Sequence, residues 1–325
     1  MSIWKLRASA IGTLAAIIGL STLFFAVILT LLGTFDLITV MIFVVGFNLV
    51  QWLISPYLIG ALYRVKEVKP GENPKLQSMV ENLSKKSGIA TPRLMIANMP
   101  IPNAFAYGSP IAGKRLAVTS ELLNTLDDGQ VEAVIGHELG HLKHRDVQVM
   151  MFVSILPAIF YYIGYSMLLS SMFGRSEKNS GGGAVIGIAA IGLYWILTLF
   201  TLQLSRTREY YADRHSASVV EDGPRKLREG LARIVNSTDR RRRSQMKRGS
   251  GSLSSLKALL IADPDMAAAD ARQLAHLGDR ALVEKFMQKP ITTLDRVQEA
   301  LSTHPNIVKR LRALKEIEQE PHASL

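Results

Sequence analysis

The stretch VIGHELGHLKHRD, residues 134–146, holds the most informative pattern in the chain. His137 and His141 are four residues apart, so on a helix both imidazoles project from one face and can reach one metal ion. Glu138 is turned aside from that face, toward a water molecule on the ion. With 7 His and 27 acidic residues among 325, an accidental match is expected on the order of once in a hundred such chains. The pattern therefore predicts a metal site rather than a solvated helix face.

A catalytic zinc site usually takes three protein ligands and one water, so a third ligand is needed. The chain has no cysteine, which leaves histidine and carboxylates as the strong ligands. His144 follows His137 by seven residues, about 10 Å along a helix axis, and is too far away to share its ion. Asp146, five residues after His141, is expected to point away from the metal-binding face. The third ligand is therefore expected from another segment.

The segment SRTREYYAD, residues 205–213, supplies the remaining candidates. Glu209 and Asp213 are four residues apart and share one face of a helix. We expect Glu209 to bind the metal and Asp213 to accept the outer N–H of a ligand histidine, which fixes the tautomer of that ring. The alternative is a pair of ordinary surface charges, and Asp213 is the next candidate for the third ligand.

Long apolar stretches explain the composition of the chain. Apolar residues make up 48% of it and the mean hydropathy is +0.18, more than a soluble domain usually has. Four stretches lack Asp, Glu, Lys and Arg: Ala8–Leu32, Leu37–Leu62, Val147–Phe173 and Ala184–Ser205. Each exceeds the roughly 20 helical residues that cross a bilayer. The first is too long for the apolar part of a signal peptide, so we expect it to remain as an anchor. The last two either span fully or form a shallower hairpin.

Basic residues beside these stretches predict which ends face the cytosol. Lys and Arg precede the first and third stretches and follow the second and fourth, whereas residues 33–36 have none. We therefore predict a multi-pass protein of the cell membrane with both termini and residues 63–146 in the cytosol, and with the loop 174–183 outside. The formal net charge of +11 fits this orientation and does not by itself predict nucleic-acid binding.

The topology divides the chain into four segments. They are two transmembrane helices at 1–62, a cytosolic part at 63–146, a transmembrane hairpin at 147–205 and a second, helical cytosolic part at 206–325. In the first cytosolic part, apolar residues at helical spacing precede Gly88, which is expected to end that helix. Short β patterns follow at 93–97, 104–107 and 115–119.

Two further features of the cytosolic segments follow from residue type. Ser120 is expected to cap a long helix that carries the H-E-x-x-H residues and that either runs through Gly129 or breaks there. Residues 239–255 are rich in Gly, Ser and Arg, which predicts a mobile loop between helices.

Several motifs together resemble the HtpX-type membrane metalloproteases. They are the stretches 134–146 and 205–213, the run Asn103-Ala104-Phe105-Ala106 and the late Thr303-His304-Pro305. The resemblance covers nearly the whole chain. It implies a mainly α, multi-pass membrane protein with a cytosolic, gluzincin-like zinc protease domain that carries a small β-sheet. It also implies an endopeptidase of membrane-protein quality control with one Zn²⁺ per chain.

The resemblance assigns roles to residues of the two main motifs. The site residues that it implies are the metal ligands His137, His141 and Glu209, the general base Glu138, and Asp213 behind a ligand. The sequence departs from the family pattern in two places. Gly136 stands where Ala is common, and Asn306 replaces a frequent second Pro after Pro305. The second departure leaves the role of that late loop open.

Two further sites are interpreted in two ways each. His304 either donates a hydrogen bond to the oxyanion of the reaction or serves as a structural, helix-capping residue. The run Asn103–Ala106 resembles an edge strand that pairs with an extended substrate, and an ordinary core strand is the alternative. Pairing through the backbone suits cleavage of unfolded segments with varied sequences.

The spacing of the motifs from the apolar stretches predicts where the metal lies. His141 is six residues before the third stretch and Glu209 is four after the fourth, so the metal is expected within roughly 10 Å of the cytosolic interface. The expected partners are therefore the lipid bilayer and unfolded or membrane-protein substrates, and no nucleic acid.

Two other functions fit parts of the sequence. A CAAX prenyl protease shares the zinc chemistry and both motifs, but it is expected to have more than four spans. A membrane-anchored binding protein uses a basic run, such as residues 240–248, to bind nucleic acid or anionic lipid. That second function has no need of H-E-x-x-H. The sequence does not define the oligomeric state.

Overall fold

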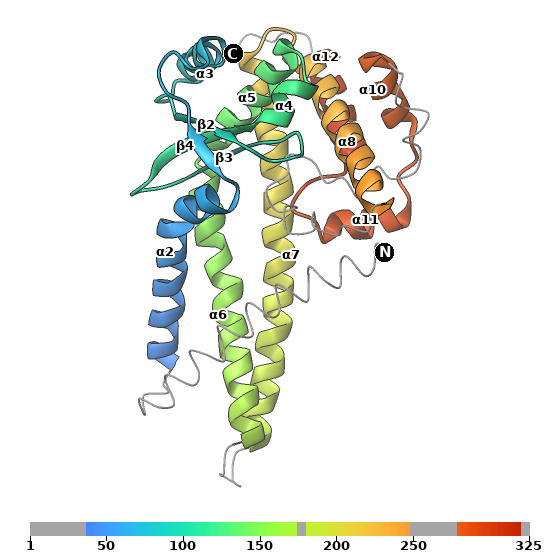
Figure 1. Cartoon of the computed structure of the whole chain (residues 1–325). Helices are drawn as coiled ribbons and strands as arrows, with labels where there is room; N and C mark the ends of the chain where they lie inside the picture. The colour runs from blue at the N-terminus through green and yellow to red at the C-terminus, as the bar shows by residue number, and fades with distance from the viewer. Residues whose placement is uncertain (1–36, 174–179, 248–277, 320–325) are drawn as a thin grey trace. The chain divides into compact units, whose positions relative to one another are not determined.

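The computed structural model describes residues 37–173, 180–247 and 278–319, which form two compact units (Figure 1). Within the described residues, the first unit comprises 37–52, 148–173 and 180–201, and the second unit comprises the remainder. The predicted first span, Ala8–Leu32, lies outside the described residues.

Three long helices carry the other apolar stretches. They are α2 (Leu37–Leu62), α6 (Asp146–Phe173) and α7 (Ser180–Val219). Among the described residues, these are the helices long and apolar enough to cross a membrane. Large side chains such as Ile42, Phe152 and Phe200 are more than half exposed on them. A helix satisfies its own backbone hydrogen bonds, so such apolar surfaces are stable in lipid. The chain is therefore a membrane protein.

In the first unit, small residues allow α6 and α7 to pack closely. A Cβ atom on Gly164 would lie 2.8 Å from the carbonyl oxygen of Gly187, and one on Gly187 would lie 3.0 Å from the carbonyl oxygen of Gly164. Glycines at such crossings let membrane helices approach through their backbones. Helix α2 joins this packing through Val44, which clusters with Tyr162 of α6.

Helix α7 extends beyond both boundaries predicted for the fourth stretch. It begins at Ser180, inside the predicted loop 174–183, and continues past Ser205 to Val219 without a break. Residues 206–219 contain neither Gly nor Pro, so nothing in that sequence ends the helix. The second site motif is thus the continuation of the helix that contains the fourth apolar stretch. Residues 174–179 lie outside the described residues.

The second unit contains a four-stranded mixed sheet. Its strands are β1 (Val65–Glu67), β2 (Arg93–Ala97), β3 (Ala104–Ser109) and β4 (Gly113–Thr119). Their order is β1-β2-β4-β3, with β2 and β4 parallel and the two outer pairs antiparallel. The three predicted β patterns fall in β2, β3 and β4. Strand β1 was not predicted because three residues are too short to show an alternating pattern. The order leaves β3 at one edge of the sheet.

The sheet is covered on both faces. Leu94, Leu116 and Val118 join a core formed with the surrounding helices. Side chains of the opposite face, such as Phe105 and Ala117, pack with Ile59 and Tyr63 at the end of α2. The predicted helix before Gly88 is α3 (Pro74–Ser87), and Gly88 ends it in the left-handed conformation with φ 68°, which glycine adopts without steric cost.

The helix predicted from Ser120 is two helices, α4 (Ser120–Thr125) and α5 (Asp128–Lys143). The side chain of Thr119, rather than Ser120, caps α4. The break comes from Asp127, which caps α5 in a reciprocal pair with Gln130. Gly129 therefore lies in the first turn of α5 and does not cause the break. The H-E-x-x-H residues therefore lie on a helix that begins at Asp128.

Helices complete the second unit, where α8 packs with α5, α10 and α12. Their bounds are α8 (Gly223–Lys247), α10 (Asp279–Gln288), α11 (Thr293–Ala300) and α12 (Ile307–Gln319). The prediction of a loop at 239–255 is wrong as far as Lys247, because residues 239–247 belong to α8. Arg, Lys, Gln and Met favour helix, and the glycines of this stretch begin only at Gly249. Residues 248–255 lie outside the described residues.

Candidate metal centre

Helices α5 and α7 pack closely because small residues face each other. A Cβ atom on Gly140 would lie 3.0 Å from the Cα of Ala212, and one on Gly136 would lie 3.2 Å from the hydroxyl oxygen of Ser216. Such distances leave no free space for a larger side chain, so glycine suits both positions. The close approach brings residues 209–213 of α7 beside the H-E-x-x-H turn of α5.

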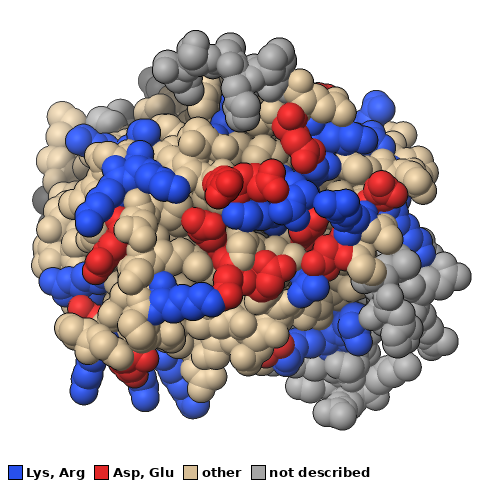
Figure 2. All heavy atoms as spheres, turned by 90° about the horizontal axis from the view of Figure 1, so that it is seen from above, with Lys and Arg blue, Asp and Glu red and all other residues tan. Residues whose placement is uncertain are grey.

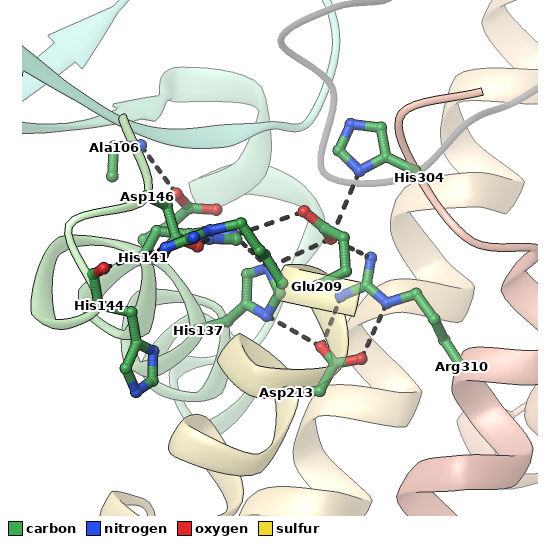
Figure 3. Close-up of polar contacts among 11 residues, drawn as sticks. Ala106, His137, His141, His144, Asp146, Glu209, Asp213, His304 and Arg310 are labelled. Atoms are coloured by element: carbon green, nitrogen blue, oxygen red, sulfur yellow. Dashed lines mark hydrogen bonds and ion pairs between the residues drawn. The ribbon is translucent and has the colours of Figure 1, made fainter. Parts of the chain in front are cut away.

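Two imidazole nitrogens and one carboxylate group from these helices converge at one point (Figure 3). The Nε2 atoms of His137 and His141 are 3.1 Å apart. Glu209 Oε2 lies 3.6 Å from His137 Nε2, and Glu209 Oε1 lies 3.5 Å from His141 Nε2. A tetrahedral zinc with bonds of about 2.0–2.1 Å separates its ligand atoms by about 3.3 Å. The donor set and its spacing therefore fit one zinc ion, and the predicted third ligand lies with the two histidines.

The outer nitrogen of His137 contacts the carboxylate predicted to support it. His137 Nδ1 lies 2.9 Å from Asp213 Oδ1. Arg310 of α12 holds Asp213 in turn, with Nε donating to Oδ2 at 2.9 Å and Nη2 donating to Oδ1 at 2.6 Å. Arg310 Nη1 also lies 3.1 Å from Glu209 Oε2. The arginine is fully buried, and it links two acidic residues of the candidate site.

The outer nitrogen of His141 contacts Asp146, which corrects the prediction that Asp146 points away. Its Oδ2 lies 2.6 Å from His141 Nδ1. The prediction assumed one continuous helix, but α5 ends at Lys143 and Arg145 adopts a left-handed φ of 56°. This turn directs Asp146, the first residue of α6, back to the site. Arg208 of α7 forms an ion pair with the other oxygen of Asp146.

His144 does not join the ligand group, as predicted. It is the C-cap residue of α5. Its ring centroid lies 6.1 Å from that of Tyr211 and 6.0 Å from that of His215. Its carbonyl accepts a hydrogen bond from Arg208 at 3.0 Å, so the residue supports the turn that carries Asp146.

Glu138 is buried between α5 and the edge strand. Its Oε2 accepts a hydrogen bond of 2.7 Å from the backbone N–H of Ala106. The N–H of Ala106 therefore points away from β4, toward the outer edge of β3. Because backbone direction alternates along a strand, Ala104 and Gly108 share this outward direction. The free edge of the sheet thus runs past the candidate general base.

The run Asn103–Ala106 divides at the start of β3. Ala104, Phe105 and Ala106 belong to the edge strand. Asn103 precedes it and pairs with Thr119: its N–H donates to the Thr119 hydroxyl and its carbonyl accepts the Thr119 N–H, both at 2.9 Å. Asn103 therefore fixes the start of the strand, and its assignment to a substrate site stays a prediction.

His304 approaches the same ligand group from the segment before α12. Its Nδ1 lies 3.4 Å from Glu209 Oε2. The alternative in which His304 caps a helix is wrong, because the side chain of Asn306 accepts the Val308 N–H at 2.9 Å at the start of α12. Capping explains a polar residue at position 306.

The pKa values of the site residues reflect burial and charge together. Burial lowers the pKa of His137, but its contacts with Asp213 and Glu209 outweigh burial and raise that pKa to about 9. Burial and the neighbouring charge of His137 lower the pKa of His141. Burial raises the pKa of Glu138, against the opposing effect of both histidines. The metal-free site therefore carries a proton on His137 at neutral pH, which a metal ion must displace.

Sequence reasoning missed Arg310 and Arg208 as parts of this site. A signal for Arg310 was present, because it lies on the same face of α12 as Ile307, Leu311 and Leu314, all of which are buried. A cation on an apolar helix face requires a buried partner of opposite charge. Arg208 had no such signal, since a basic residue next to an apolar stretch is common in membrane proteins.

Comparison with known proteins agrees with this geometry. The profile of peptidase family M48 matches residues 70–318. The protease HtpX homolog of Thermoplasma acidophilum is 37% identical over 273 residues, which cover 83% of this chain and 82% of that protein. The protease HtpX homolog 2 of Sulfurisphaera tokodaii is 35% identical over 333 residues, which cover 97% of this chain and 98% of that protein.

A solved structure has a similar fold. S. mikatae Ste24p matches with a TM-score of 0.56 and 18% identity, over 96% of this chain and 66% of that chain. At this identity the likeness concerns the fold alone. The family profile spans most of the chain, and the HtpX homologs match over most of their own length, so the chain belongs to peptidase family M48 and is an HtpX-like membrane protease.

Proposed function

We propose that the chain is a zinc-dependent endopeptidase that cleaves unfolded or misassembled membrane proteins at the cytosolic face of the cell membrane. The observation that carries this proposal is the convergence of His137, His141 and Glu209, whose ligand atoms are 3.1 to 3.6 Å apart. Glu138 is buried beside them and contacts an edge strand.

The residues of the chain divide the chemistry among them. His137, His141 and Glu209 would hold a zinc ion, which when bound would supply Lewis acidity toward a water molecule and the scissile carbonyl. Glu138 would accept a proton from the attacking water and return it to the leaving amine. In the metal-free protein, burial raises the pKa of this carboxyl group. Asp213 and Asp146 each hold a ligand histidine in one tautomer. His304, near Glu209, donates a hydrogen bond to the oxyanion.

The edge strand supports the proposed substrate class. A peptide that adds to β3 pairs through its backbone, so selection depends on an extended conformation more than on side chains. Ala106 donates to Glu138, which lies against this edge, so a paired peptide passes the general base. Unfolded segments meet this requirement and folded domains do not.

The proposed location rests on the sequence around α7 and on the charges beside the apolar stretches. Glu209 belongs to the same helix as the fourth apolar stretch and follows it by four residues. Basic residues flank the apolar stretches on the side that carries the site residues, which favours the cytosolic face. Loops of membrane proteins at that face are the nearest substrates.

The rival function as a basic binding protein has less support. Lys and Arg side chains are interspersed with Asp and Glu on the face that Figure 2 shows. Some basic residues are paired within helices, as in the 3.1 Å ion pair between Arg225 and Glu229. Nucleic-acid binding proteins gather their cations on a continuous patch. Most side chains of the basic run 240–248 lie outside the described residues.

Zinc analysis and a cleavage assay on the purified full chain in detergent test the proposal. The parent is expected to hold one zinc and to cleave unfolded casein in a chelator-sensitive way. Glu138→Gln should keep the zinc and lose cleavage by a factor of at least about 10², whereas Glu209→Ala should lose zinc affinity and cleavage together. Parent-like cleavage by Glu138→Gln refutes the general base, and parent-like zinc affinity of Glu209→Ala refutes the third ligand.

A further inference from the structure

Helix α11 exposes its large apolar side chains, together with Thr293 and Arg296, and buries two of its polar side chains. Leu294, Val297 and the C-cap residue Leu301 are 55%, 53% and 53% exposed. In contrast, Gln298 and Glu299 are 6% and 7% exposed. The spacing of three and four residues places the three apolar side chains, here called the apolar stripe, on one face. A helix at a water-facing surface has the opposite arrangement, so the stripe indicates a partner other than water.

Polar contacts on the inner side fix this orientation of α11. The Oε1 atom of Glu299 accepts the backbone N–H of Asn306 at 3.2 Å, and its Oε2 atom forms an ion pair with Lys309. At the other end, Thr292 and Asp295 form a reciprocal capping box. A half-turn rotation that buried the stripe would break the inner contacts. The outward direction of the stripe therefore belongs to the fold of the second unit.

The C-terminal end of α11 is attached to α7 where the apolar stretch of that helix ends. The guanidinium of Arg206 donates to the carbonyls of Glu299, Ala300 and Ser302 at 2.8, 3.1 and 2.7 Å, and Figure 1 shows α11 beside α7. Arg206 directly follows the stretch Ala184–Ser205, which has no charged residue. The first charged residue after an apolar span lies near the point where the helix leaves the hydrocarbon core.

We propose that α11 lies in the bilayer interface and inserts its apolar stripe at the boundary between headgroups and acyl chains. Lipid fits better than a second copy of the chain, because the three side chains expose roughly 300 Å², well below the ~800 Å² per partner of a stable dimer. An inserted amphipathic helix needs only a short apolar face beside an existing membrane anchor.

The insertion gives the segment after α11 a second point of support. This segment runs from Ser302 to Asn306 and carries His304, whose Nδ1 lies 3.4 Å from Glu209. Arg206 holds its first carbonyl and α12 holds its end. The bilayer thus supports the element from which His304 reaches the candidate metal centre.

A lipid-quenching experiment on the full chain tests the insertion. Because the chain has no cysteine, Val297→Cys provides one labelling site for a bimane fluorophore. The labelled protein is placed, at one copy per disc, in phosphatidylcholine nanodiscs with or without brominated acyl chains. We expect about a twofold fall in fluorescence with brominated lipid. The matched control, Glu316→Cys on the exposed face of α12, should give equal fluorescence in both lipids.

Accessibility to aqueous iodide separates the remaining outcomes. Insertion predicts weak iodide quenching at position 297 and strong quenching at position 316. Strong iodide quenching at 297 without lipid quenching would mean that the stripe faces water. Protection from both quenchers would mean that protein covers it. Either result overturns the proposal, and Leu294→Cys repeats the test at a second position of the stripe. Neither measurement uses catalysis, so the result is independent of the proposed protease chemistry.

Discussion

Removal of the buried charge of Arg310 tests how the C-terminal helix supports the metal centre. Arg310→Met keeps a long apolar stem but leaves Asp213 and Glu209 buried without their shared cation. Removing one partner of a buried ion pair costs about 3–5 kcal/mol. His137, with a pKa of about 9, still supplies one positive charge at pH 7. We therefore expect the free energy of unfolding of the metal-free protein to fall by about 3 kcal/mol, near the lower end of that range.

Thermal unfolding of the full chain in detergent measures this loss. At about 2–4 °C per kcal/mol, the midpoint of the metal-free variant should fall by about 6–12 °C. Zinc restores positive charge beside the two carboxylates, so the difference from the parent should shrink when zinc is saturating. Arg312→Met is the matched control on the same helix, since Arg312 is exposed and, among the described residues, donates to the backbone carbonyls of Met287 and Lys289. An equal midpoint for the parent and Arg310→Met without metal would refute the reasoning.

Three further predictions concern the supporting residues, pH and orientation. Asp146→Asn should weaken zinc binding about 10–100-fold in a titration against a competing chelator, and parent-like affinity would show that the contact with His141 has no effect. Because metal-free His137 is protonated below pH 9 and zinc binds the neutral ring, apparent zinc affinity should fall about tenfold per pH unit on going down from pH 9. An affinity independent of pH between 6.5 and 8.5 would contradict this. Reporters at Gly71 and Gly182 should lie on opposite sides of the membrane, with Gly71 in the cytosol. A reporter at Gly71 that is accessible from outside would contradict the predicted orientation.

Short-range patterns made much of the candidate site predictable. His137, Glu138 and His141 depend only on the spacing of one helix, and that spacing holds wherever the helix lies. Glu209 was reached by the need for a third ligand together with a helical spacing of four residues to Asp213. Gly88 predicted the end of α3 because a left-handed residue at a helix end favours glycine. These inferences needed no knowledge of how the elements pack.

The missing parts depend on turns and on packing between distant elements. Asp146 was misjudged because a left-handed Arg145 reverses the chain direction, and no local pattern marks a non-glycine residue for that conformation. Arg310 comes from a helix 97 residues beyond Asp213, so only the packing of α12 shows which carboxylate it meets. Strand β1 and the split between α4 and α5 were missed for similar reasons, since short elements carry weak periodic signals.

His137 and His141 of the candidate site have the same kind of support, and its parts come from separate elements. His137 contacts Asp213, which Arg310 holds, and His141 contacts Asp146, which Arg208 holds. A carboxylate behind a ligand histidine increases its basicity, and the arginine offsets the cost of burying that carboxylate. Because α5, α6, α7 and α12 each supply a member, no local segment forms the complete site. Metal affinity should therefore depend on the packing of the whole second unit, and partial unfolding of α12 should release zinc before the sheet unfolds.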